Sequence, residues 1–229
     1  MKTTLIKNII LGLAAMTFIT TANAEDSNKE NKTKDMQVKV LVVGLDNVGS
    51  NYFPAPMITE ETGIPQDSIG DTYNRIITNN IIQANKDKKY TFVSSENLPD
   101  VNTLVTEVKV NGENEDTYAD LSNVNKEEFS KILNEADADY VLFLNKHYLK
   151  WQDTPLRTLF HFVSYSLYDR NQHEVTKGNN YFTCMNLEKG AKLSKASRKS
   201  SSKIASEVIK SINKDFWVST YLRLILICS

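Results

Sequence analysis

The chain has 229 residues, of which 41% are hydrophobic, so it can build an ordinary core. Its 27 Lys and Arg residues nearly balance 28 Asp and Glu residues, for a net charge of −1. This balance argues against nucleic acid as a partner, because nucleic-acid binding needs an excess of positive charge on the protein.

The first 24 residues have the three-part layout of a secretory signal peptide. Lys2 and Lys7 flank the start, an apolar run follows over residues 9–16, and Ala22-Asn23-Ala24 forms a small-x-small cleavage site. The apolar run is too short for a membrane span, which needs about 20 residues. We therefore predict an exported protein, periplasmic or secreted after cleavage near Ala24. The signal carries two Lys and no acid, so the remainder has a net charge of −3.

A disordered tether is predicted over residues 25–36, because residues 25–35 contain no large apolar side chain to bury. A single α/β domain is expected over residues 37–229. It begins with a strand over residues 37–45, whose apolar residues first alternate and then become continuous. This pattern is typical of a strand in the middle of a sheet.

A long loop is predicted over residues 46–66, because Gly and Pro recur along it. Loops of this length in compact domains are often functional. Tyr52 and Phe53 either pack against the core or present an aromatic surface, and they are candidate partner residues.

Residues 69–84 form the first predicted helix, with Ser68 as its cap and an apolar stripe at helical spacing. A short strand over residues 90–93 follows. This strand–helix–strand order predicts a parallel pair of strands with a right-handed crossover.

The middle of the chain carries weaker signals. Residues 104–110 alternate enough to predict a strand, and residues 111–120 read as an acidic loop. A second helix is expected to follow, capped by Asn125, with Phe129 and Ile132 among its inward-facing residues.

Three strands with short connections are predicted over residues 140–151, 156–168 and 173–185, and they should form an antiparallel meander. A last helix is expected over residues 192–212. The apolar segment 216–228 is predicted to be a strand at the sheet edge, with a partner-binding or membrane-dipping tail as the alternative. The predicted fold is therefore α/β with an α+β tendency. It combines a mixed sheet, an early β-α-β unit, the meander and a C-terminal helix packed on the sheet.

Motifs for catalysis or cofactor binding are weak. The glycines of residues 44–49 lack the spacing of either phosphate-binding motif, and a turn explains them better. Ser200-x-x-Lys203 resembles a penicillin-binding nucleophile motif, but its companion motifs are absent. His147 and His161 could reach each other on neighbouring strands and hold a metal with Asp153, although a paired or solvated role is commoner. We predict no catalytic residue, no cofactor and no metal site.

The two cysteines, Cys184 and Cys228, are too few for a disulfide framework. The sequence leaves open whether they form one bridge or remain two small core residues.

A basic tract runs over residues 189–203 and contains six Lys and Arg residues but no acid. It is either a solvated helix face or a surface that attracts anionic envelope polymers or lipid head groups. Its candidate partner residues are Lys192, Lys195, Arg198 and Lys199.

Two strand segments resemble a group of envelope proteins. Residues 136–144 read ADADYVLFL after a short helix, and residues 38–43 carry a V-x-V-L phrase in the first strand. The order of elements over residues 37–212 is similar to the TolB amino-terminal-like domain, seen also in the curli-secretion protein CsgG and in penicillin-binding-protein activator lipoproteins. The chain departs from them in having no lipobox cysteine, no propeller repeats and no pore hairpins. The resemblance implies a binding module of the cell envelope with no catalytic residues to transfer.

We therefore expect an exported, non-enzymatic envelope protein that binds another protein through its α/β domain. One alternative is a secreted hydrolase whose site assembles only in three dimensions. Another is a binder of envelope polymers or of a membrane surface, peripherally, through residues 189–203.

Overall fold

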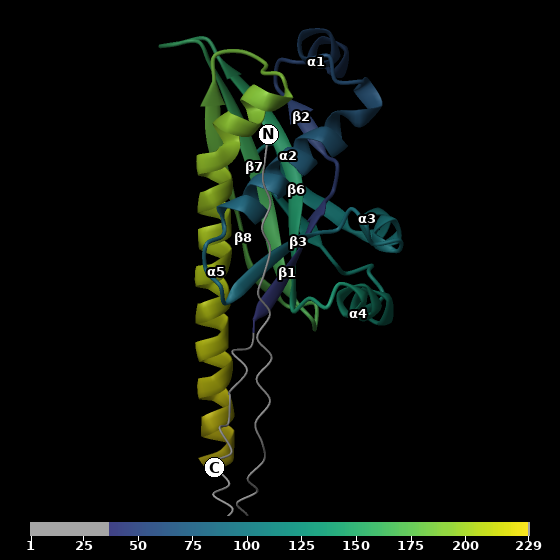
Figure 1. The fold of residues 1–229 in the computed structure, drawn as a ribbon, viewed down its shortest axis with the longest axis vertical. Helices are drawn as coiled ribbons and strands as arrows, with labels where there is room; N and C mark the ends of the chain where they lie inside the picture. The colour runs from purple at the N-terminus through teal and green to yellow at the C-terminus, as the bar shows by residue number, and fades with distance from the viewer. Residues whose placement is uncertain (1–36, 229) are drawn as a thin grey trace, which may run out of the picture. The chain divides into compact units, whose positions relative to one another are not determined.

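The computed structural model describes residues 37–228 of the chain, with side chains as far as Phe216. Its centre is a mixed sheet of six strands (Figure 1). Their order is β3-β1-β6-β7-β8, and β2 pairs with β6 beside this path. The strands are β1 (Val38–Gly44), β2 (Val48–Ser50), β3 (Tyr90–Ser94), β6 (Tyr140–Gln152), β7 (Thr158–Asp169) and β8 (Glu174–Cys184).

Helices and a separate hairpin complete the described part of the chain. The hairpin consists of β4 (Lys109–Glu113) and β5 (Asp116–Asp120). A 3-10 turn over Gln66–Ser68 precedes the second helix. The helices are α1 (Ala55–Thr62), α2 (Ile69–Ala84), α3 (Val101–Glu107), α4 (Lys126–Glu135) and α5 (Gly190–Cys228).

The predicted fold class is confirmed. β1 pairs in parallel with both of its neighbours, and Val40 lies opposite Phe92 on one side and Tyr140 on the other. The expected crossover through α2 therefore joins two neighbouring parallel strands. β6, β7 and β8 form the expected antiparallel meander.

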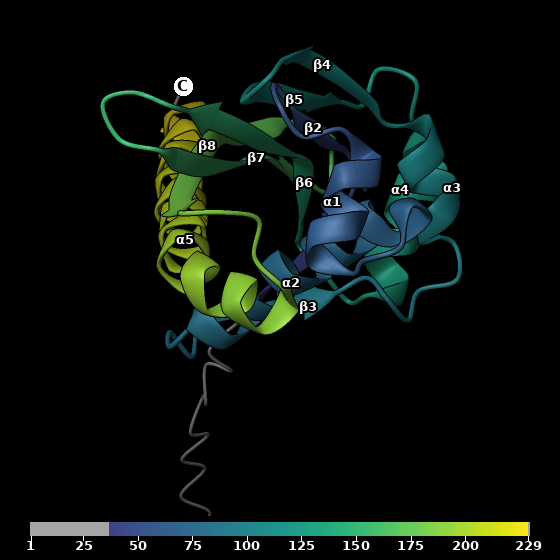
Figure 2. The same ribbon diagram turned by 90° about the horizontal axis from the view of Figure 1, so that it is seen from above.

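Alternation along β1 divides the core into two layers. Val40 and Val42 belong to the layer with α2 and α5, whereas Leu41 and Val43 belong to the layer with α3 and α4. All four side chains are at most 1% exposed. Figure 2 shows α2 and α5 on one side of the strands, and α3, α4 and the hairpin on the other.

A β-bulge at Asn145 determines which side chains of the second half of β6 enter each layer. The pairing register with β7 shifts between Leu144 and Lys146. Leu144 and Leu149 consequently lie in the same layer, although residues five apart in a regular strand face opposite sides. The Asn145 amide donates to the Thr117 carbonyl and the Ser166 hydroxyl, both at 3.0 Å, and so ties the hairpin to the sheet.

The prediction of a loop over residues 46–66 is wrong, because this segment contains β2 and α1. The prolines favoured a loop in the sequence, but Pro56 lies in the first turn of α1, where its missing N–H would have no helical partner. Gly63 ends the helix with a left-handed φ of 76°, and its N–H donates to the Thr59 carbonyl.

The prediction for residues 104–120 is also wrong in part. Residues 101–107 are helical, and Val101, Leu104 and Val108 are buried at helical spacing. The acidic segment 111–120 belongs mostly to the hairpin rather than to a loop. Its acids mark the solvent side of a hairpin that is held against the sheet by Thr117 and Ala119.

The helix caps differ from each other. The Asn125 side chain accepts from the N–H groups of Glu127 and Glu128, which confirms the predicted cap of α4. Ser68 occupies the cap position of α2, but its hydroxyl donates to the Asp67 carboxylate and makes no capping bond.

The prediction of a strand over residues 216–228 is wrong, because α5 continues to Cys228. After Gly190 the sequence contains no Gly or Pro that would break the helix. The helix places Cys228 roughly 57 Å along its axis from Gly190, too far for a bridge to Cys184. Among the described residues, none of the helices combines the length and the hydropathy of a membrane-spanning segment.

Two serines in the first half of α5, Ser194 and Ser197, form hydrogen-bonded contacts with α2. Ser197, Ser200 and Ser201 are at most 2% exposed. Asn80 of α2 donates at 2.8 Å to both the Ser194 carbonyl and the Ser197 hydroxyl. The Asn80 amide satisfies the Ser194 carbonyl and the Ser197 hydroxyl, whereas the buried Ser201 hydroxyl has no partner among the described residues.

We expect Asn80→Ala to lower the free energy of unfolding by about 2 kcal/mol, because it leaves the Ser197 hydroxyl and the Ser194 carbonyl without the amide. Urea unfolding measures this change. Gln83→Ala, an exposed position of the same helix, is the matched control. Equal losses in the two variants would show that the amide bonds do not stabilise the α2–α5 contact.

Candidate functional site

A groove opens at the end of the sheet where β2, β6 and β8 finish, and we call it the aromatic groove. Its volume is about 590 Å³, within the range of ordinary ligand-binding clefts. It is lined by Tyr52, Phe53, Met57, Glu61, Trp151, Arg157, Met185, Asn186, Leu187, Glu188 and Lys192. Segments far apart in the chain therefore meet at this end of the molecule.

Three aromatic rings pack together on one wall of the groove. The rings of Tyr52 and Trp151 are stacked, with centroids 6.0 Å apart. Phe53 meets both rings edge-on, at 5.0 Å from Tyr52 and 5.7 Å from Trp151. Such contacts hold aromatic side chains in defined positions.

Hydrogen bonds from the end of β2 hold this wall in place. The Ser50 hydroxyl accepts from the backbone N–H groups of Tyr52 and Phe53. The backbone N–H of Trp151 donates to the Asn51 side-chain oxygen at 2.8 Å, and the Asn51 side-chain amide donates to the backbone carbonyl of Trp151 at 3.3 Å. The Asn51 side chain thus continues the pairing of β2 with β6 by one step.

The groove combines exposed apolar side chains with charges of both signs. Tyr52 is 57% exposed and Met185 is 69% exposed, although both are large apolar residues. Lys192 forms an ion pair with Glu188 at 3.5 Å, and Arg157 lies 4.0 Å from the Asp153 carboxylate. The apolar surface is therefore surrounded by a charged rim.

The structure brings together three of the six predicted partner residues. Tyr52, Phe53 and Lys192 line the aromatic groove. Lys195 and Lys199 lie farther along α5, and Arg198 is exposed about 120° around the helix from Lys192. Trp151 and Met185 were not predicted as groove residues, because in the sequence each stands at the end of a predicted strand.

The two histidines on neighbouring strands meet, but in the core rather than at a surface. His147 Nε2 lies 3.0 Å from His161 Nδ1, and the two residues are at most 1% exposed. Their other ring nitrogens and the Tyr73 hydroxyl have no hydrogen-bond partner among the described residues. No group of three metal-ligating side chains occurs in that part of the chain.

The remaining motifs have structural explanations. Ser200 is buried and donates to the Asn180 side-chain oxygen, while Lys203 is exposed, so the Ser-x-x-Lys pattern forms no site. Gly44 allows the close approach of Asn74, whose amide donates to the Asp46 carboxylate. The Cys184 thiol is free, and burial raises its pKa to about 11.

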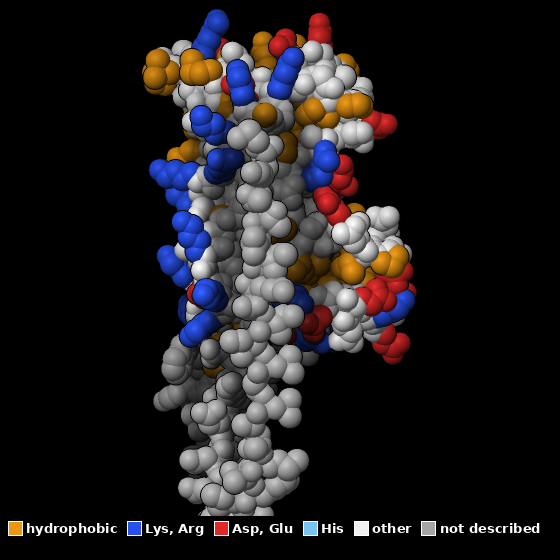
Figure 3. Space-filling view, in the orientation of Figure 1, with side chains coloured by type: hydrophobic (Ala, Val, Ile, Leu, Met, Phe, Trp, Pro, Cys, Tyr) orange, Lys and Arg blue, Asp and Glu red, His pale blue; other side chains and the backbone are white. Residues whose placement is uncertain are grey.

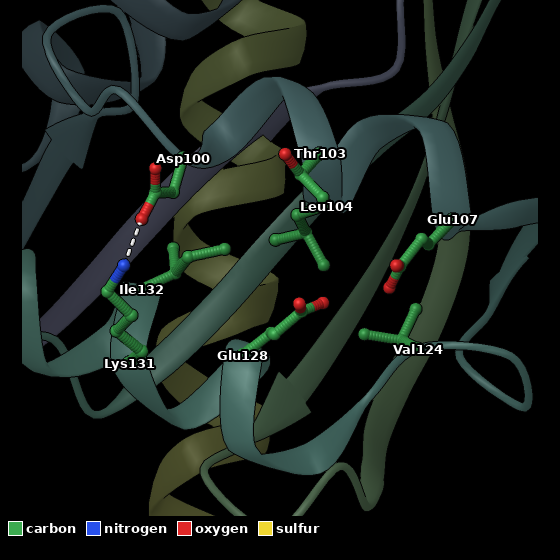
Figure 4. Close-up of a pocket in the computed structure, with 8 residues that line it drawn as sticks. All are labelled: Asp100, Thr103, Leu104, Glu107, Val124, Glu128, Lys131 and Ile132. Carbon is green, nitrogen blue, oxygen red and sulfur yellow. Dashed lines mark hydrogen bonds and ion pairs between the residues drawn. The ribbon is translucent and has the colours of Figure 1, made fainter.

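Another hollow lies between α3 and α4 and measures about 260 Å³. Figure 4 shows the Glu107 and Glu128 side chains projecting into it, with Asp100 paired to Lys131 at one end. The Asp100 carboxylate raises the pKa of Lys131, first through its hydrogen bond and then through its negative charge. This hollow is smaller than the aromatic groove and exposes few apolar side chains.

No protein-family model and no curated protein matches the chain. Several solved structures are similar to it. A point variant of the PelC dodecamer from Paraburkholderia phytofirmans is 12% identical and has a TM-score of 0.38, with 75% of this chain and 87% of that chain covered. A hypothetical protein of Chlamydia trachomatis is 10% identical, with a TM-score of 0.40 and coverage of 64% and 72%.

The LpoB C-terminal domain from Salmonella enterica is 14% identical and has a TM-score of 0.29, with 64% of this chain and 82% of that chain covered. At these scores the matches carry no argument about function. The function is therefore inferred from the residues of this chain.

We expect the buried histidine pair to make the protein sensitive to acid. Burial lowers the pKa of His147 to about 3, and burial together with His147 lowers the pKa of His161 well below its ordinary value. Below about pH 6.5 the unfolded chain binds protons that the native pair does not bind. The free energy of unfolding should then fall by up to about 1.4 kcal/mol per pH unit for each histidine.

Urea unfolding between about pH 7 and pH 4.5 measures this slope. The double variant His147→Phe/His161→Phe removes the titrating groups, so its slope should be shallower. His173→Gln removes the third, exposed histidine and serves as the control. A double variant that keeps the wild-type slope would assign the acid sensitivity to other groups.

Proposed function

We propose that the chain is an exported, non-enzymatic module of the cell envelope that binds a protein partner in the aromatic groove. The exposed pair Tyr52 and Met185, which both line a groove of about 590 Å³, is the observation that carries this proposal. Export rests on the signal-peptide pattern of residues 1–24, which lie outside the described residues.

The composition of the groove supports a protein as its occupant. Aromatic residues and Met are enriched at the centres of protein interfaces, and polar residues surround them. Tyr52, Trp151 and Met185 provide such a centre, and the charges of Glu61, Arg157 and Lys192 lie around it. A partner would pack an apolar side chain against the rings and Met185.

The rigidity of the aromatic wall also supports binding. Trp151 donates its ring N–H to the Asp153 carboxylate at 3.0 Å, in addition to its backbone bonds with Asn51. Side chains that are already held in place lose less conformational freedom when a partner binds.

The placement of reactive side chains supports a non-enzymatic role. The histidine pair is buried in the core, out of reach of a substrate. The raised pKa of Cys184 keeps its thiol protonated at neutral pH, which disfavours nucleophilic attack. Neither group lines the aromatic groove.

The hydrolase alternative has one location in its favour. A hollow of about 250 Å³ lies beyond the carboxyl ends of β1 and β3, where α/β folds often bind ligands. Asp46, Asp71, Arg75 and Glu96 line it. The Asp46 carboxylate already accepts from the Asn74 amide, which favours a structural role for that residue.

We expect Tyr52→Ala/Met185→Ala to weaken partner binding at least about 10-fold, because exposed anchors of an interface lose most of their contact when truncated. Immobilised variants are exposed to envelope extract, and the retained proteins are compared. Tyr181→Ala removes another exposed aromatic residue, 54% exposed, and should retain the same partner as the wild type. Both changes lie at exposed positions, so folding should be preserved.

A photo-crosslinking residue at position 185 should capture that same partner, whereas one at Lys126 on α4 should not. Apolar contacts are weakly screened, so the capture should persist at about 0.5 M salt. Retention by the double variant, or equal crosslinking from both positions, would contradict the proposed groove.

A further inference from the structure

The outer face of α5 carries a line of lysines. At 100° per residue, six lysines fall within an arc of about 100° on the helix. We call this set the lysine stripe, and its members are Lys192, Lys195, Lys199, Lys203, Lys210 and Lys214. The stripe is about 33 Å long, and Figure 3 shows Lys and Arg side chains gathered along α5.

The stripe faces away from the rest of the protein. All six lysines are exposed, and the buried residues Ile204, Val208 and Ile212 lie on the opposite side of the helix. The basic tract predicted from the sequence ends at Lys203. The helical spacing adds Lys210 and Lys214 to the same face and leaves Arg198 outside it.

Little negative charge neutralises the stripe. Among the described residues, Lys192 is the only member with an ion pair, to Glu188. The sequence has no acid from residue 189 to 206. Glu207 follows, but its carboxylate accepts from the Tyr165 hydroxyl at 2.7 Å and is directed toward the sheet.

The chemistry of the helix changes where the stripe ends. Phe216 is 62% exposed, and residues 216–228 of the same helix read FWVSTYLRLILIC, in which Arg223 is the one charged residue. A soluble polyanion would complement only the lysines. A lipid bilayer complements both parts, because its head groups attract lysines and its interface accepts apolar residues.

We propose that α5 lies along an anionic lipid bilayer, with the lysine stripe on the head groups and the apolar turns 216–228 at the interface. Two weak signals on one helix would together provide reversible, peripheral attachment. This surface is separate from the aromatic groove apart from Lys192, so it adds to the proposed protein-binding role.

The test measures binding of the full chain to phosphatidylcholine vesicles with and without about 30% phosphatidylglycerol, by co-sedimentation. The stripe variant is K195Q/K199Q/K203Q/K210Q, in which Gln preserves helix propensity. The control variant is K86Q/K88Q/K109Q/K126Q, which removes the same charge from exposed lysines elsewhere. Circular dichroism confirms that each variant is folded.

We expect the wild type and the control to bind the anionic vesicles alike, and the stripe variant to bind about 100-fold more weakly, since each lysine near an anionic surface contributes several-fold to affinity. L224S/L226S should also weaken binding, by about 10-fold, if the apolar turns reach the interface.

Equal binding by the stripe and control variants would overturn the proposal, and so would a wild type that ignores the anionic lipid. A wild type that binds soluble polyphosphate but not the vesicles would assign the stripe to a polymer instead.

Discussion

The β-bulge at Asn145 decides which side of the sheet each residue of the second half of β6 faces. One extra residue reverses the alternation, so His147, Leu149 and Trp151 face the layer that contains α2. Without it, Lys146 and Tyr148 would take their places. The Asn145 amide bonds to Thr117 and Ser166 stabilise this register, and the position of Trp151 in the aromatic groove depends on it.

The long helix α5 performs two tasks with different residues. On its inner side, Ser194 and Ser197 bond with Asn80 of α2, and Ile204, Val208 and Ile212 in the second half belong to the buried core. Its outer side carries the lysine stripe. A helix without an apolar stripe in its first turns can therefore still be part of the core, provided that the partner supplies hydrogen bonds as Asn80 does.

The strong periodic patterns of the sequence were sufficient to predict the architecture. β1, α2 and the meander have long, regular patterns, and the structure has them near the expected bounds. The errors concern short elements that depend on a tertiary partner: β2, with three residues, exists because it pairs with β6. The helix α3 buries Val101 and Leu104 in the core layer that it shares with α4. The local propensity of residues 101–107 gives no sign of this tertiary contact.

The groove itself was only partly predictable. Tyr52 and Phe53 stood out as aromatic residues in a turn-rich segment, whereas Trp151 and Met185 belong to ordinary strand ends. Their meeting depends on the bulge and on the length of the meander strands. The sequence placed the two histidines on neighbouring strands, but their burial follows from the packing of Tyr73 and Phe182 around them.

Lys192 belongs both to the rim of the aromatic groove and to the first turn of the lysine stripe. If α5 rests on a bilayer as proposed, the groove is held close to that surface as well. A partner that is itself attached to the same bilayer would then search for the groove in two dimensions instead of three. This confinement raises its effective concentration, so a modest intrinsic affinity could suffice.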